Sequence, residues 1–162
     1  MKKFLVPLIV ACAGLMLVAV ASANPPTITK LRQLPAVYTL TPADTGCPFD
    51  VQVNGYDNVV IQDFYDKAGN LTKEVFHDDF VGTESANGVT LDSSEHATIT
   101  ENYVDGTETW TGQPLKLSTP HGGTVTLDAG KLVYGPDGSI VVDHGPHPYA
   151  EGDTADYCGA FA

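Results

Sequence analysis

The sequence predicts an all-β protein, an antiparallel meander that closes into a barrel of about eight strands. Two observations predict this class. After residue 23 no helical periodicity is found, and β-branched and aromatic residues recur in short runs that turn residues separate. Runs joined by short turns pair with their sequence neighbours, and closure into a barrel removes the unpaired edges of the sheet. A two-layer β-sandwich is the alternative.

The turn signals combine Asn, Asp or Pro with Gly, residue types that tolerate the backbone angles of tight hairpins. They occur at Asn54-Gly55, 66–70, Asn87-Gly88, Asp105-Gly106, 121–123 and 136–138. Between them the sequence predicts strands at 48–53, 56–65, 71–81, 89–93, 96–104, 107–118, 124–128, 131–135 and 139–144. Residues 46–162 then form a single barrel domain, and the proline-containing residues 24–45 are expected to form an extended N-terminal arm.

The first 23 residues have the pattern of a signal peptide. Lys2 and Lys3 precede an apolar run that ends near Val20, and Ala21-Ser22-Ala23 is a small-residue cleavage site. Cys12 lies in a lipoprotein-like box and would be the alternative N-terminus, but eight further residues of apolar sequence follow it. We therefore expect cleavage after Ala23, secretion to the outside of the cell, and no stable membrane insertion of the mature chain.

The chain is strongly acidic. Of 162 residues, 20 are Asp or Glu and eight are Lys or Arg. Removal of the signal peptide takes away two lysines, so the mature chain has six basic and 20 acidic residues and a formal charge of −14. Such a charge excludes a polybasic nucleic-acid binder, because phosphate contacts need clustered Lys and Arg.

Two cysteines remain after the signal peptide, Cys47 and Cys158. An even pair in an exported chain is read as one disulfide. The bridge would connect the start of the domain to its end across 111 residues. Closing a loop of that size stabilises the fold by roughly 4–5 kcal/mol in the chain-entropy model.

Strand alternation selects polar residues that share a face with core residues, because side chains two apart point to the same side. Glu101 follows Ala97 and Ile99, and His144 follows Ile140 and Val142. Glu101 and His144 are therefore the candidate acid–base pair for catalysis. The candidate ligand-binding set lining the barrel is Asp63, His77, Ile99, Glu101, Tyr103, Ile140, Val142 and His144.

Two points of that assignment stay open. The phase of 71–81 is ambiguous, because Phe76 and Phe80 alternate with Val75 and His77. The polar residues could also lie at strand ends, where a barrel meets water. Trp110 is expected in the core rather than in a sugar or peptide site.

No cofactor or metal is predicted. His144 and His147 are three residues apart and are the weak candidates for metal ligands, but zinc requires three or four ligands and further candidates are distant in sequence. Nucleotide-binding glycine patterns, the Gly-x-Ser-x-Gly elbow and His-Glu-x-x-His are missing from the sequence.

Several short segments resemble small secreted proteins of actinobacteria. They are Cys47-Pro-Phe-Asp-Val51, residues 63–71, Gly130-Lys-Leu-Val-Tyr134, Asp143-His-Gly-Pro-His147 and the closing Tyr157-Cys158. The likeness extends over residues 46–160. It implies an exported β protein with a terminus-linking disulfide, and it brings no activity and no functional residues with it.

Three function classes follow from the sequence. The first is a non-enzymatic module that binds a small, partly apolar ligand inside the barrel. The second is an extracellular interaction or structural module with a filled core and a protein partner. The third is an enzyme of the cyclase or isomerase kind that uses Glu101 and His144.

Overall fold

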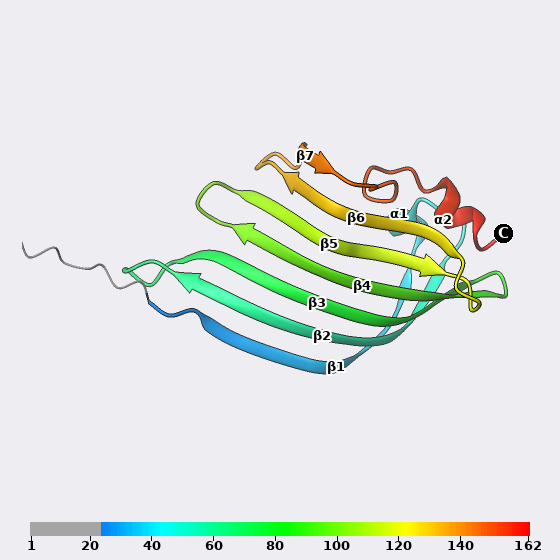
Figure 1. The fold of residues 1–162 in the computed structure, drawn as a ribbon, viewed down its shortest axis with the longest axis horizontal. Coiled ribbons are helices and arrows are strands. Elements are labelled where there is room, and N and C mark those ends of the chain that lie inside the picture. The colour runs from blue at the N-terminus through cyan, green and yellow to red at the C-terminus, as the bar shows by residue number, and fades with distance from the viewer. Residues whose placement is uncertain (1–23) are drawn as a thin grey trace, which may run out of the picture.

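The computed structural model describes residues 24–162, which form one antiparallel sheet of seven strands in the order β1-β2-β3-β4-β5-β6-β7 (Figure 1). Two short helices lie at the same end of the sheet. The proposed signal peptide lies outside the described residues. The strands are β1 (Thr27–Leu40), β2 (Val51–Tyr65), β3 (Leu71–Ala86), β4 (Val89–Asn102), β5 (Thr107–Ser118), β6 (Thr124–Tyr134) and β7 (Ile140–His144), and the helices are α1 (Pro42–Thr45) and α2 (Ala155–Gly159).

The meander follows from the turn chemistry. Asn87 and Gly88, with φ values of 51° and 83°, form the tight connection between β3 and β4. In the next hairpin upstream, the Asp66 carboxylate accepts the backbone N–H groups of Ala68 and Asn70. The predicted all-β antiparallel meander is therefore confirmed for residues 24–162.

The sheet is open. β1 and β7 are its two edges and do not pair with each other, so closure into a barrel is not found, and a single sheet is not a sandwich. The residues expected to form a separate N-terminal arm include β1, which pairs with β2 along most of its length. Several predicted strands are also continuous with one another, so each strand is longer than expected.

Asn54-Gly55 was predicted to be a turn, and this is wrong, because both residues lie inside β2. Gly55 pairs with Gly82 of β3, and the ring of Phe80 lies over both glycines. A Cβ atom on Gly55 would be 2.6 Å from the Val81 carbonyl oxygen and 2.7 Å from the Phe80 ring. The glycine therefore serves close packing between strands, a role that glycine also has in strand interiors.

The two faces of the sheet differ in burial. The inner face carries the buried residues Val53, Phe80, Ala97 and Leu132. The phase of β3, left open by the sequence, is set by Phe76 and Phe80, which pair with inner-face residues of β2 and β4. The outer face carries alternate residues such as His77.

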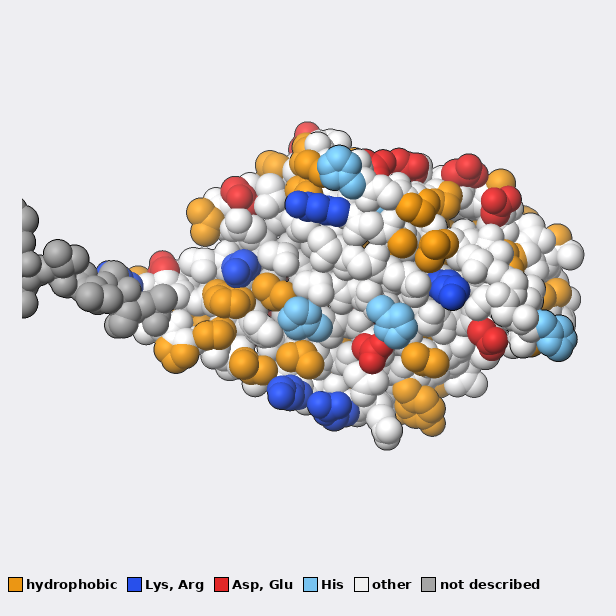
Figure 2. Space-filling model, in the orientation of Figure 1, with side chains coloured by type: hydrophobic (Ala, Val, Ile, Leu, Met, Phe, Trp, Pro, Cys, Tyr) orange, Lys and Arg blue, Asp and Glu red, His pale blue; other side chains and the backbone are white. Residues whose placement is uncertain are grey.

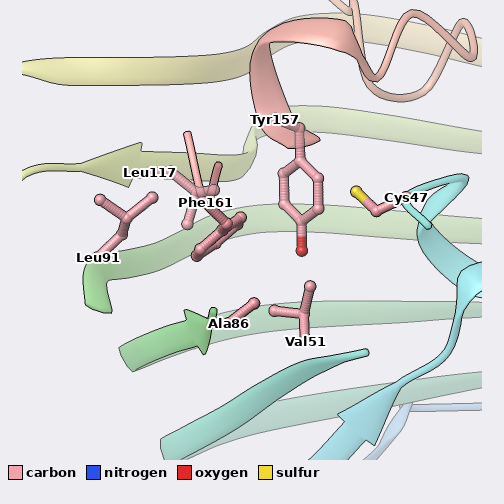
Figure 3. Close-up of a cluster of buried hydrophobic side chains, with 7 residues drawn as sticks. All are labelled: Cys47, Val51, Ala86, Leu91, Leu117, Tyr157 and Phe161. Carbon is pink, nitrogen blue, oxygen red and sulfur yellow. The ribbon is translucent and has the colours of Figure 1, made fainter. Parts of the chain in front are cut away.

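The C-terminal segment, residues 146–162, covers one end of the inner face. Figure 3 shows Tyr157 pointing from α2 toward Val51, and Phe161 lying near Leu117. Tyr157 and Phe161 are 2% and 0% exposed, and their ring centroids are 5.6 Å apart. Burying two such side chains stabilises the fold by several kcal/mol, about 1.5–3 kcal/mol for each.

The predicted disulfide is present. Cys47 and Cys158 are bonded, with Cα atoms 5.4 Å apart, and Cys47 belongs to the same buried cluster as Tyr157. The bond indicates an oxidising environment, in agreement with the expected export. No helix within residues 24–162 is long and apolar enough to cross a membrane.

We predict that Gly55→Ala destabilises the fold by about 1–3 kcal/mol, because the added methyl group overlaps the Val81 backbone and the Phe80 ring. Urea unfolding followed by circular dichroism measures the change. Gly159→Ala is the matched control, since a Cβ there meets nothing within 4 Å. Equal stability of the Gly55→Ala variant and the native protein would contradict the packing role.

Candidate functional site

A cavity of about 470 Å³ lies between the inner face of the sheet and the C-terminal segment. Six strands contribute to its wall, and Tyr149, Ala150 and Tyr157 of the C-terminal segment line it on the other side. The wall is mostly aromatic and aliphatic. The remaining lining residues are Ala36, Tyr38, Leu40, Val53, Asp57, Asp78, Phe80, Glu84, Ser93, Ser94, Glu95, Trp110, Pro114, Leu115, Asp128, Leu132 and Tyr134.

An irregularity in β5 shapes the middle of this wall. The register between β4 and β5 shifts between Ser94 and His96, so that Pro114 and Leu115 both lie opposite Glu95. Proline is tolerated at such a bulge because it has no N–H to donate to the neighbouring strand. Pro114 and Leu115 therefore contribute apolar wall next to a carboxyl group.

Two of the five carboxyl groups in the wall attach the C-terminal segment to the sheet. Glu84 accepts a hydrogen bond of 2.6 Å from the Tyr157 hydroxyl and one of 2.8 Å from Ser93. Asp128 accepts the backbone N–H groups of Tyr149 and Ala150 at 3.1 and 2.9 Å. Both side chains are buried, and these bonds to charged acceptors satisfy them.

The other three carboxyl groups surround Phe80. Asp57 on β2 and Glu95 on β4 lie directly opposite Phe80, and Asp78 is two residues before it on β3. Residues so related in adjacent strands have side chains on one face and within reach of one another. One oxygen of Asp57 and one of Asp78 are fully buried and have no hydrogen-bond partner.

The closeness of these carboxyl groups, together with their burial, raises the pKa values of Glu95 and Asp78. Burial first, and then the charges of Asp78 and Asp57, raise the pKa of Glu95 from its ordinary 4.5 to about 8. Burial, followed by a hydrogen bond and charge repulsion from Asp57, raises the pKa of Asp78 from 3.8 to about 7. The two groups can therefore hold protons at neutral pH and exchange them there.

The negative charge of the carboxyl groups in the wall also affects Tyr38, on β1. Burial raises the pKa of its phenol, and the next causes are the charges of Glu84, Glu95 and Asp57. In Tyr157, burial and then the charge of Glu84 raise the phenol pKa. Both phenols therefore remain protonated. The Tyr157 hydroxyl donates its hydrogen bond to Glu84, and the Tyr38 hydroxyl can donate one into the cavity.

Four of the residues predicted from alternation lie outside the cavity, three on the inner face of β2 and β4 and one in the turn after β4. Asp63, Ile99 and Glu101 share the inner face, as predicted, but they lie beyond the cavity wall. Tyr103 is exposed in the turn after β4, and its hydroxyl donates a hydrogen bond of 2.5 Å to Glu101 and another to Glu74. The structure brings Glu101 and Tyr103 together, away from the cavity.

The inward orientation predicted for His77, Val142 and His144 is wrong. His77 lies on the outer face, where its Nδ1 is 3.0 Å from the Thr98 hydroxyl. In β7 a register shift next to Ile140 leaves Val142 opposite Val133 and His144 opposite Lys131, both outer-face positions. Ile140 is exposed at the sheet edge.

The candidate acid–base pair is consequently not assembled. Glu101 is on the inner face of β4, His144 is on the outer face of β7, and two strands separate them. The structure therefore does not bring Glu101 and His144 together as the predicted acid–base pair.

The candidate metal ligands also separate. His147 is buried at 2% exposure, with its Nε2 3.4 Å from the His144 carbonyl oxygen and 3.8 Å from an Asp143 carboxylate oxygen, whereas the His144 side chain is exposed. Within residues 24–162, no three His, Cys, Asp or Glu side chains have an arrangement that could hold a metal ion.

The sequence reasoning missed the cavity carboxyl groups, although a signal for them existed. Asp57 has the same parity as Val59 and Ile61, and Asp78 has the same parity as Phe76 and Phe80. Asp57 lies within the predicted strand 56–65 but was not selected there, and the ambiguous phase of 71–81 hid Asp78. Trp110, expected in the core, lines the cavity.

Comparison with protein-family models, with curated proteins and with solved structures gives no match. Any function is therefore inferred from the geometry of the site itself.

We predict that the folded state loses stability as the pH rises from about 5 to about 8. Asp78 and Glu95 have raised pKa values, so the folded state holds their protons more tightly than the unfolded state, and this advantage disappears as the pH passes those values. Urea unfolding at several pH values measures the slope.

Variants of Asp78 and Glu95 distinguish their contribution to the pH dependence of stability from that of other ionisable groups. Asp78→Asn and Glu95→Gln should each reduce the slope by about half, since two groups share it. The matched control is Asp92→Asn, which is on the outer face of β4 and exposed. Stability that is flat between pH 5 and pH 8 in the native protein would refute the assignment.

Proposed function

We propose that this protein is a non-enzymatic, exported module that binds a small, partly apolar molecule in the cavity between the sheet and the C-terminal segment. The observation that carries the proposal is the cavity itself, about 470 Å³ in volume. Sites for small molecules are concave, range from about 300 to 1,000 Å³, and combine an apolar wall with a few polar groups.

The lining has this composition. Phe80, Trp110, Leu132 and Tyr134 supply apolar and aromatic surface, and the three carboxyl groups around Phe80 supply polar contacts. The cavity is also built on strands and lined on its other side by a segment that the Cys47–Cys158 disulfide holds to the sheet, which favours a site formed before a ligand arrives. A preformed site reduces the entropy that binding must overcome.

An extracellular interaction module with a filled core is the rival proposal. The Tyr157 and Phe161 cluster fills one end of the inner face, and the cavity lies next to it. The two proposals therefore differ in whether the space beside Tyr157 accepts a molecule.

Trp110 makes a direct test possible, because it is the single tryptophan of the sequence and lines the cavity. The mature protein is titrated with 2-phenylethylamine, 2-phenylethanol and 3-phenylpropanoate while Trp110 fluorescence is recorded. We expect at least one probe to give a saturable change, with a dissociation constant of about 1 mM or lower.

The variant Ala36→Phe fills the cavity from β1 and should weaken that binding at least tenfold, about 1.4 kcal/mol. Ala43→Phe, on exposed α1 outside the cavity, is the matched control and should bind as the native protein does. The proposal is refuted if no probe binds, or if Ala36→Phe binds as tightly as the control.

A further inference from the structure

We propose that the molecule bound in this cavity is a small organic cation, an amine with an aromatic or aliphatic body. The inference rests on the proposed function and specifies the ligand class of the same site. Four features of the described residues support it: uncompensated charge in the wall, buried oxygens without donors, aromatic faces, and separation of basic residues to the opposite face.

The charge in the wall has one sign. Five lining residues are carboxylic acids, and within residues 24–162 no Lys, Arg or His side chain lines the cavity. Glu84 and Asp128 are satisfied by bonds to the C-terminal segment. Asp57, Asp78 and Glu95 have no such role in the fold.

Two oxygens of the carboxyl cluster around Phe80 could accept hydrogen bonds from a ligand. The buried oxygens of Asp57 and Asp78 accept no hydrogen bond, and leaving such a group unsatisfied costs free energy. Protonation relieves the repulsion between Asp57 and Asp78 only in part. A proton shared between the two carboxyl groups leaves their other lone pairs without a hydrogen-bond donor. An ammonium group supplies three donors and a positive charge.

Aromatic side chains surround the same space. Phe80 lies among the three carboxyl groups, and Tyr38, Trp110, Tyr134 and Tyr149 also line the cavity. The faces of aromatic rings attract organic cations, and Trp does so most strongly. Carboxylates together with aromatic rings are the combination that recognises an amine with an apolar body.

The fold keeps the lysines of its strands away from this face. The four strand lysines, Lys30, Lys73, Lys116 and Lys131, all occupy outer-face positions of the register. Figure 2 shows one side of the sheet, over which Lys, Arg and His side chains are spread. Lys73 has its own aromatic partner there, with its Nζ 4.0 Å from the centre of the Phe64 ring. No strand lysine neutralises the inner carboxyl groups.

The central experiment compares two probes of equal size and different charge, 2-phenylethylamine and 2-phenylethanol, by isothermal titration calorimetry at pH 7.5. We expect the amine to bind at least tenfold more tightly than the alcohol. Because the pKa of Glu95 is raised to about 8, Glu95 is mainly protonated at this pH, so amine binding should also release protons, seen as an apparent enthalpy that differs between phosphate and Tris buffers.

Three variants locate the effect. Asp78→Asn and Glu95→Gln keep the side-chain shape and should each weaken amine binding about tenfold, about 1.4 kcal/mol, and so reduce the preference for the amine over the alcohol. Asp92→Asn is the matched control on the outer face and should leave both affinities unchanged. Circular dichroism of each variant establishes that it is folded.

The outcomes separate the two proposals. Equal affinity for amine and alcohol, with both lost in Ala36→Phe, would refute the cation inference and leave the ligand-binding function supported. Preferential binding of 3-phenylpropanoate would also refute the cation inference. If no probe binds, both proposals are refuted.

Discussion

The contact between the C-terminal segment and the inner face of the sheet supports the remaining structure. An open sheet must bury one face, and here Tyr157 and Phe161 bury part of it. The Cys47–Cys158 bond joins the segment after α1 to α2. Because the segment covers only one end of the face, the sheet is left with a cavity beside the core. The packing of the C-terminal segment on the sheet thus both stabilises the fold and forms one side of the candidate site.

The polar groups of that contact have divided roles. Glu84 and Asp128 are buried carboxyl groups whose bonds to Tyr157, Tyr149 and Ala150 hold the segment in place. In the cluster around Phe80, one oxygen of Asp57 and one of Asp78 have no hydrogen-bond partner, although the cluster lies on the same face. Buried ionisable groups without a structural role are costly, and strongly perturbed pKa values occur more often at functional sites than elsewhere.

Strand alternation correctly predicted the face of the sheet on which a side chain lies where the strand is regular. The prediction failed where a bulge interrupts the strand. Asp63 and Glu101 lie on the inner face, as their parity indicates. His144 was placed wrongly because a register shift in β7 adds one residue and reverses every side chain after it. Gly55 was placed in a turn because an Asn-Gly pair has the same sequence whether it bends the chain or makes room for Phe80.

By itself, the sequence determined the all-β meander, most of its hairpins and the disulfide, since turn chemistry and cysteine pairing depend on residues near in sequence or few in number. Only the tertiary structure decided whether the sheet closes and which carboxyl groups lie close together. It also decided to which face of the sheet the side chains after each bulge point. These features depend on long-range register and on the position of the C-terminal segment, neither of which a local pattern encodes. The cavity carboxyl groups Asp57, Asp78 and Glu95 come from three strands, so only their pairing brings them together.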